Sequence, residues 1–155
     1  MSDFVHLHNH SHYSLQDGAC TIDDLVNTTK EKGMNSIALT DHGVMFGVSE
    51  FYRKATNAGI KPIVGMEAYI AMDGSRFDKG GENTGRKRSK HYNHLVLLAK
   101  NKTGYNNLIK LSSIGFTEGF YYKPRIDMEV LAKHSEGLVC TTACPAGPVS
   151  VHLIN

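Results

Sequence analysis

Four histidines stand at every second position near the start of the chain, and an acidic residue follows them closely. The run FVHLHNHSHYSLQDG places His8 and His10 two residues apart, with His6 and His12 on either side and Asp17 beyond them. Residues two apart on an extended strand point to the same face, so His8 and His10 could share one cation. Imidazole is a frequent ligand of zinc. The run therefore predicts a metal site, and surface or hydrogen-bonding histidines are the alternative.

Further residues of ligand type lie at or near the ends of later apolar segments, and in chain order they are Asp41, His42, Glu67, His94 and Cys144. Glu67 is the single acid in the apolar run 61–71, where a carboxylate is costly to bury unless it is paired or bound to a metal. Cys144 follows another apolar run, and a buried structural thiol is the alternative there. Asp41 could orient His42 or bind a cation itself. His94 lies at the start of its predicted strand, whereas the other candidates lie at or near the ends of theirs.

The apolar periodicity predicts short strands that alternate with helices. Strands are expected at residues 4–7, 35–40, 61–71, 94–100 and 137–142. Helices are expected around Leu25, Phe51, Leu108 and Val130. Thr21 with Asp24 has the pattern of a capping box before the first helix. Strand followed by helix, repeated, is typical of a parallel α/β fold. Because ligand-type residues follow several strands, a (β/α) barrel is favoured over a doubly wound sheet, whose ligands gather at one switch point.

Size and composition narrow the class of protein. The chain has 155 residues, 41% of them hydrophobic, and a net charge of +2 with neutral histidines. This charge gives no strong argument for nucleic acid, and no apolar run is long enough for a membrane span. Three cysteines do not suggest a disulfide framework, so we expect a reduced, cytoplasmic protein. A closed (β/α) barrel needs about 250 residues, so the chain is expected to be the front part of a longer protein.

Two basic stretches could contact phosphate. Residues 72–92 contain glycines, charges and almost no aliphatic side chains, which predicts a flexible basic loop. Its basic cluster at 86–90 could touch phosphate, although a solvated face is the commoner role of such a run. Lys123 and Arg125 in the KPRID block could hold a scissile phosphate as charge clamps do. A surface salt bridge is the alternative for both.

Six blocks closely resemble, in this order, the PHP (polymerase and histidinol phosphatase) domain of the α subunit of bacterial replicative DNA polymerase III: HLHNHSHYSLQDGA, ALTDHGVMFGVSEFY, GIKPIVGMEAYIA, HLVLLAKNKTGYNNLIKLSS, GFYYKPRID and GLVCTTACPAG. The resemblance runs from about Phe4 to the last residue and is weakest at 72–92. It implies a distorted seven-stranded (β/α) barrel, a (β/α)7 fold of which this chain would form the N-terminal part. The barrel would hold up to three metal ions through nine ligands, and the final D-x-H motif would lie beyond residue 155.

The resemblance implies seven metal ligands in this chain, spread over three cations: His8 and His10 at the first, Glu67 bridging it to the second, His94 and Cys144 at the second, and Asp17 and His42 at the third. His94 is preferred to His91 because it directly precedes the LVLLA strand. His6 is expected to pack or hydrogen-bond, and His12 to support a ligand.

The chemistry of these ligands agrees with the implied function. Imidazole, carboxylate and thiolate suit Zn²⁺, and imidazole with carboxylate also admits Mn²⁺. Metals bridged by a carboxylate can activate a water and neutralise a phosphodiester. The resemblance therefore implies a metal-dependent phosphoesterase of the 3′–5′ exonuclease type, acting on a DNA primer end.

The resemblance also implies a parent chain, a DNA-directed DNA polymerase in which this domain contacts the rest of the polymerase. Little catalysis is expected of the 155 residues alone. One alternative is a non-catalytic module that stabilises the polymerase or binds a separate proofreading exonuclease. Another is a free-standing phosphatase of small molecules.

Overall fold

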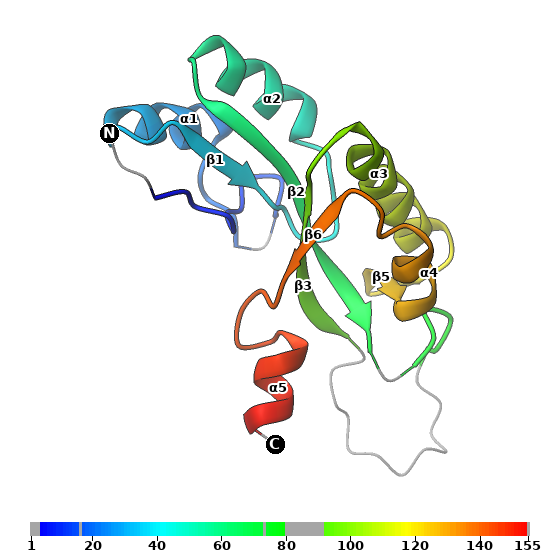
Figure 1. Cartoon of the computed structure of the whole chain (residues 1–155). Coiled ribbons are helices and arrows are strands. Elements are labelled where there is room, and N and C mark those ends of the chain that lie inside the picture. The colour runs from blue at the N-terminus through cyan, green and yellow to red at the C-terminus, as the bar shows by residue number, and fades with distance from the viewer. Residues whose placement is uncertain (1–3, 16, 73, 80–91, 155) are drawn as a thin grey trace.

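The computed structural model describes residues 4–15, 17–72, 74–79 and 92–154 (Figure 1). Its elements, in chain order, are α1 (Ile22–Glu31), β1 (Ser36–Leu39), α2 (Val48–Asn57), β2 (Lys61–Ala71), β3 (Asn93–Ala99), α3 (Lys102–Thr117), β4 (Phe120–Tyr121), β5 (Lys123–Asp127), α4 (Met128–Lys133), β6 (Leu138–Thr141) and α5 (Pro148–Ile154). The predicted helices and the four later predicted strands therefore form close to their expected places. Most of the predicted loop 72–92, with its basic cluster and His91, lies outside the described residues.

The sheet is built around β2, which is 11 residues long. β1 pairs in parallel with its first part and β5 in parallel with its end. β3 pairs with β2 in the antiparallel direction, as do β6 with β3 and β4 with β5. The expected all-parallel arrangement is therefore wrong, although the α/β class is right. Parallel neighbours need a long crossover connection, usually a helix. Between β2 and β3, the described residues 72, 74–79 and 92 contain no helix, and β3 is antiparallel to β2.

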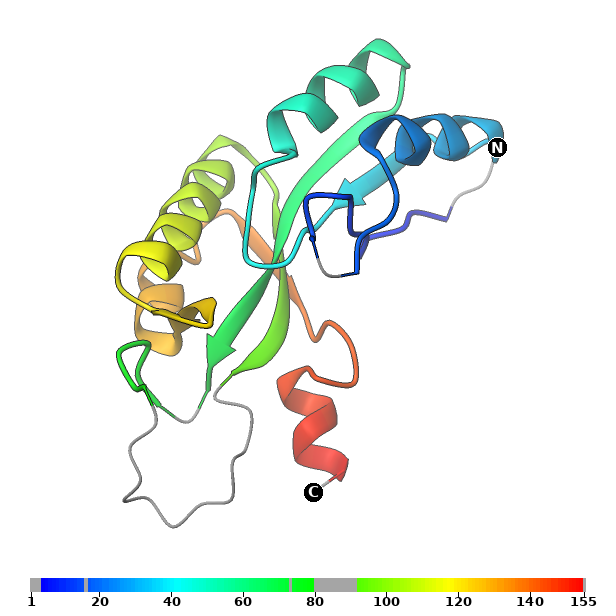
Figure 2. The same cartoon turned by 180° about the vertical axis from the view of Figure 1, so that it is seen from behind.

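The N-terminal histidine segment is not a strand, contrary to the prediction for residues 4–7. It lies along β1, as Figures 1 and 2 show, and is held there by hydrogen bonds of its backbone and of the Asn9 side chain. Ala38 N donates to His6 O at 3.0 Å and Thr40 N donates to Asn9 O at 2.9 Å. The Asn9 side chain donates to Ala38 O at 3.0 Å. These bonds are too widely spaced to make a regular ladder, but they fix the segment beside the sheet.

Alternation along β2 separates the core from the opposite face of the sheet. Met66, Ala68 and Ile70 are buried against Leu108 and Leu111 of α3. The side chains between them in sequence, at 67 and 69, point to the other face. α1 and α2 lie together over one end of the sheet, while α3 and α4 cover the other (Figures 1 and 2). The face that carries position 67 is thus left free of these helices.

The helix ends follow from local chemistry. Thr21 accepts a hydrogen bond from Asp24 N at 3.1 Å, and the Asp24 side chain accepts one from Thr21 N, which confirms the predicted capping box. Asn101 caps α3 in a similar way, because its side chain accepts from Gly104 N at 3.0 Å. Such caps satisfy backbone donors that the first turn leaves unpaired.

Asp127 joins three parts of the structure. Its carboxylate caps α4 by accepting from Val130 N at 3.2 Å, and it accepts from Arg76 N at 2.9 Å and from Arg76 Nη1 at 3.0 Å. Burial raises the pKa of Asp127, but the backbone hydrogen bonds from Arg76 and Val130 and the guanidinium of Arg76 outweigh burial and hold this pKa below its ordinary value. The ionised form therefore stabilises the fold.

Asp127→Asn is expected to lower the free energy of unfolding at pH 7 by about 2 kcal/mol. A carboxyl whose folded pKa is lowered stabilises the fold above its unfolded pKa of roughly 4 and loses that contribution as the pH falls through the folded value. The difference in the free energy of unfolding between wild type and variant, measured by urea unfolding, should therefore shrink from pH 5 to pH 3. Glu129→Gln is the matched control, because Glu129 lies 3.6 Å from the same arginine but is 70% exposed. An equal difference in the free energy of unfolding at both pH values would contradict the claim that ionised Asp127 stabilises the fold.

Candidate metal centre

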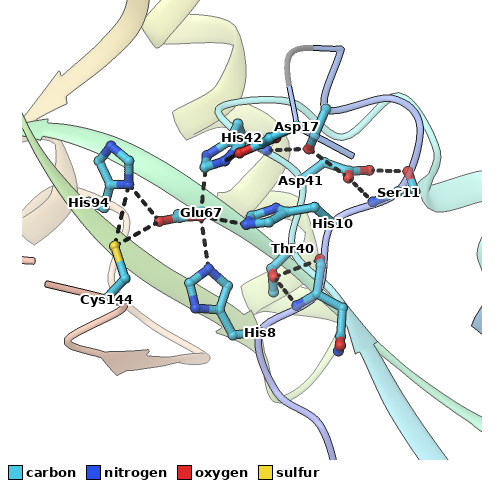
Figure 3. A network of polar contacts seen from close by, with 12 residues as sticks. His8, His10, Ser11, Asp17, Thr40, Asp41, His42, Glu67, His94 and Cys144 are labelled. Atoms are coloured by element: carbon cyan, nitrogen blue, oxygen red, sulfur yellow. Dashed lines mark hydrogen bonds and ion pairs between the residues drawn. The ribbon is translucent and has the colours of Figure 1, made fainter. Parts of the chain in front are cut away.

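Glu67 is the centre of a group of side chains on the free face of the sheet (Figure 3). It is only 1% exposed. One carboxylate oxygen, Oε2, lies 2.8 Å from His8 Nε2 and 2.9 Å from His10 Nε2. The other oxygen, Oε1, lies 2.8 Å from His94 Nδ1. Imidazoles from the N-terminal segment and from β3 therefore meet at opposite oxygens of one carboxylate on β2.

Three further residues complete the group. His42 Nδ1 lies 3.2 Å from Glu67 Oε2, and His42 Nε2 lies 2.9 Å from Asp17 Oδ2. Cys144 Sγ, which follows β6, lies 3.7 Å from His94 Nδ1 and 3.9 Å from Glu67 Oε1. The structure thus brings together all seven side chains that were expected as ligands, here called the ligand cluster: His8, His10, Asp17, His42, Glu67, His94 and Cys144 (Figure 3). Their roles as ligands stay predictions.

The end of β1 positions His42 against Glu67 through the backbone. Glu67 N donates to Asp41 O at 3.1 Å and Gly43 N donates to Glu67 O at 2.8 Å, which extends the β1 register as an isolated bridge between His42 and Glu67. Gly43 has φ of +66°, and a Cβ there would lie 2.7 Å from Pro124 Cγ. A side chain at this position would be strained by the backbone conformation and would crowd Pro124. The chain can therefore turn toward α2 directly after His42.

Asp41 lies beside the ligand cluster but turns away from Glu67. Its buried carboxylate accepts hydrogen bonds from Ser11 N at 2.6 Å, from Ser11 Oγ at 2.9 Å and from Ser14 Oγ at 2.9 Å. Ser14 Oγ also accepts from His42 N at 3.1 Å. Asp41 thus ties the N-terminal segment to the end of β1. These hydrogen bonds favour the orienting role over the metal-binding role, and both roles stay predictions. Ser11 and Ser14 were not foreseen, because serines carry no distinctive pattern in the sequence.

The electrostatics of the ligand cluster centre on one negative charge. Burial raises the pKa of Glu67, but hydrogen bonds from His10, His8 and His94 outweigh burial and hold this pKa far below its ordinary value. Burial lowers the pKa of His10, yet the hydrogen bond and charge of Glu67 more than compensate and raise it. Burial dominates at His42 and lowers its pKa. Glu67 therefore stays ionised at neutral pH, whereas His42 is biased toward the neutral form that binds metals.

The donors in the ligand cluster fit a divalent cation. Among the described residues, His10 Nδ1 is buried without a hydrogen-bond partner, and His42 Nδ1 has Glu67 Oε2 at 3.2 Å but forms no hydrogen bond with it. The two rings stack with centroids 4.0 Å apart. Two stacked imidazoles cannot both carry positive charge without strong repulsion, whereas a neutral ring offers a lone pair to a cation. Within the described residues, His8, His10 and Glu67 form one group with ligand atoms within 4.8 Å, and His42, Glu67 and His94 form another. Glu67 is the carboxylate that the two groups share.

The two expected phosphate clamps lie in different surroundings. Arg125 is buried, and it donates from Nε to Gly119 O at 3.1 Å and from Nη2 to Arg76 O at 3.0 Å. Burial lowers the pKa of Arg125. These two donors are used within the fold rather than by the ligand cluster, and a phosphate-clamping role of Arg125 stays a prediction. Lys123 does approach the ligand cluster, since its Nζ lies 5.4 Å from the centroid of the Tyr69 ring.

Tyr69 is a buried neighbour of the ligand cluster that the sequence reading missed. Its ring stacks on His42, with centroids 5.8 Å apart, and meets the edge of His94 at 5.2 Å. Burial raises the pKa of Tyr69, so the phenol stays protonated at neutral pH. The available signal was its place two residues after Glu67, which puts both on one face of β2. By contrast, His6 and His12 are exposed and lie outside the ligand cluster.

Comparison with known proteins assigns the family. The family model described as "PHP domain" matches residues 6–155. The chain belongs to the PHP domain family. The structure is a mixed α/β fold built on one sheet, so the predicted α/β fold class is confirmed. No helix in the described part of the PHP domain combines the length and the apolar character that crossing a membrane requires.

Curated relatives of the PHP domain include α subunits of DNA polymerase III. It is 55% identical over 146 residues to the DNA polymerase III subunit alpha of Borreliella burgdorferi, covering 94% of this chain and 12% of that protein. It is 51% identical over 152 residues to the same subunit of Treponema pallidum, covering 98% of this chain and 13% of that protein. Among solved structures, an amidohydrolase from Chromobacterium violaceum aligns with a TM-score of 0.44 and 21% identity, over 71% of this chain and 33% of that one.

Proposed function

We propose that this PHP domain is a metal-dependent phosphoesterase with 3′–5′ exonuclease activity, working within a DNA polymerase III α subunit. The observation that carries the proposal is the position of Glu67, whose two oxygens face separate sets of donors. A carboxylate shared in this way suits a pair of cations bridged by one ligand. Similarity to α subunits of DNA polymerase III supports the placement of this domain within such a subunit. The chain spans about an eighth of the length of these relatives.

The side chains of the ligand cluster have separate parts in this proposal. His8 and His10 would hold a cation at Glu67 Oε2, while His94 and Cys144 would hold one at Oε1. Imidazole and thiolate donors favour Zn²⁺, and the imidazole–carboxylate side also accepts Mn²⁺. When bound, such cations activate a water and neutralise charge on a phosphodiester. Asp17 and His42 supply a further acid–imidazole pair, at 2.9 Å, for a third cation.

Residues outside the ligand cluster complete the proposed site. Tyr69 packs a buried ring against His42 and His94, so it limits how these imidazoles turn and keeps water from that side. Lys123 places an ammonium next to Tyr69, where it can neutralise a phosphate that approaches the ligand cluster. The partners in this proposal are a DNA primer 3′ end and the rest of the polymerase chain, in the cytoplasm.

The full-length protein carrying His8→Ala and His10→Ala is expected to lose at least 100-fold of its exonuclease rate on a 3′-mismatched primer with Zn²⁺ or Mn²⁺. The reason is that the two imidazoles nearest Glu67 Oε2 are removed, and a cation that loses both of these ligands binds weakly. The rate is measured by release of the labelled 3′ nucleotide, beside polymerase activity of the same preparation. His12→Ala is the matched control, because this exposed histidine of the same segment lies outside the ligand cluster. Nuclease activity retained in the double variant would refute the proposal.

A non-catalytic docking role in the same polymerase is a second candidate, and a row of exposed rings favours it. Phe46, Phe116 and Phe120 are 65%, 39% and 52% exposed, and neighbouring centroids lie 6.1 and 6.0 Å apart. Contiguous exposed apolar side chains often mark protein contact surfaces. This role, which includes binding a separate proofreading exonuclease, would leave the wild-type protein without nuclease activity under either metal.

A further inference from the structure

Tyr122 combines a costly backbone conformation with a side chain that is mostly exposed. It is the single residue between β4 and β5, where Tyr121 pairs with Lys123. Its φ is +58°, in the left-handed region that glycine tolerates and that costs free energy for a tyrosine. Its side chain is 81% exposed. A large ring kept in a strained and exposed position points to a role outside folding.

The tip of this hairpin lies beside the ligand cluster. Lys123 Nζ, next in sequence, lies 5.4 Å from the Tyr69 centroid, and the Tyr69 ring contacts His42 and His94. On the other side, the Tyr122 ring meets the Tyr121 ring with centroids 4.6 Å apart and planes at 66°. The hairpin therefore contacts Tyr69 through Lys123, and Tyr69 in turn contacts two imidazoles of the ligand cluster.

We propose that Tyr122 stacks an unpaired base of single-stranded DNA whose backbone enters the metal centre. This inference rests on the proposed phosphoesterase function and names the form of its substrate. An exposed aromatic ring is the side chain on which proteins stack bases without regard to sequence. Lys123 supplies the positive charge that the adjoining phosphate needs, because it follows Tyr122 directly and its ammonium lies 5.4 Å from the centroid of the Tyr69 ring. An unpaired end, as at a mismatched primer terminus, exposes the face of the base to the ring, whereas a paired end does not.

The test compares the full-length protein with its Tyr122→Gly and Tyr122→Phe variants. Dissociation constants for a fluorescent single-stranded oligodeoxythymidine, measured by anisotropy with and without Mn²⁺, should rise about tenfold for Tyr122→Gly and stay within twofold for Tyr122→Phe. The ratio of kcat/KM for this oligonucleotide to that for bis(p-nitrophenyl) phosphate should fall about tenfold in Tyr122→Gly. Its urea midpoint should not fall, because glycine relieves the positive φ. A merely structural tyrosine would give the opposite pattern.

Tyr52→Ala is the control for loss of an exposed tyrosine, since this residue is 57% exposed on α2, away from the hairpin. Its oligonucleotide affinity should equal that of the wild type. Equal affinity of Tyr122→Gly and wild type would overturn the proposal and assign the exposed ring to a protein contact. Failure of the wild type to hydrolyse either substrate would instead refute the phosphoesterase function, while the binding comparison would still decide the role of Tyr122.

Discussion

Glu67→Gln is expected to weaken the binding of Zn²⁺ or Mn²⁺ by at least 100-fold. Glu67 belongs to both groups of ligand-type atoms in the described structure, so one substitution removes a charged ligand from each. Its pKa lies far below the ordinary value, because hydrogen bonds from three imidazoles outweigh the effect of burial, and it therefore presents a full negative charge at neutral pH. The amide of glutamine has nearly the same shape but no charge to offer a cation.

Titration calorimetry and metal analysis of the dialysed protein measure this effect directly. The unfolding transition without metal shows whether the variant is folded, so loss of binding can be separated from loss of structure. Glu118→Gln is the matched control, because Glu118 pairs with Arg76 at 2.7 Å and is remote from the ligand cluster. An unchanged metal stoichiometry and affinity in Glu67→Gln would show that the cations, if bound, do not use this carboxylate.

Chelation of bound metal is expected to produce the second large effect, a fall in thermal stability. Ligand that binds only the folded state stabilises it by about 4 kcal/mol at 1,000 times its dissociation constant. For a domain of this size that corresponds to a shift in Tm of roughly 10 °C. The effect is large because the ligand cluster joins the N-terminal segment, β1, β2, β3 and the segment after β6. In particular, His8 and His10 lie on a segment that few backbone hydrogen bonds hold to the sheet.

Thermal unfolding is followed in EDTA and after readdition of Zn²⁺ or Mn²⁺ at fixed protein concentration. Readdition should restore the wild-type Tm, and Glu67→Gln should respond to neither treatment. The pH dependence provides a further check, because imidazole must be deprotonated to bind metal and the shift should diminish as the pH falls below about 6. A Tm that is the same with chelator and with metal would contradict a cation-bound ligand cluster.

The position of the N-terminal segment explains why the histidine pattern alone was an incomplete guide. A straight strand would place all four imidazoles of an alternating run on one face, but this segment makes no regular ladder with β1. Asp41 binds Ser11 and Ser14 instead and draws the chain round the end of β1. As a result His8 and His10 meet Glu67, while His6 and His12 are exposed.

Lys123 and Arg125 show that the local sequence also cannot predict the surroundings of charged residues. Both are cations on one short strand, and nothing in the KPRID block distinguishes them. Tertiary packing does so, because the carbonyls of Gly119 and Arg76 accept the Arg125 guanidinium in a buried position, whereas Lys123 lies over Tyr69. Burial and hydrogen-bond partners come from segments distant in sequence, so local pattern cannot predict them.

The sequence by itself determined the places of the helices, the apolar strands, the capping box at Thr21 and the residue types suited to a metal. These features depend on periodicity and on contacts within a few residues. Only the tertiary structure decided that β3 runs against β2, that Asp41 holds the N-terminal segment and that both oxygens of Glu67 are used. Such features depend on which segments pack together, and the free energy of that packing is a sum over contacts between residues far apart in the chain.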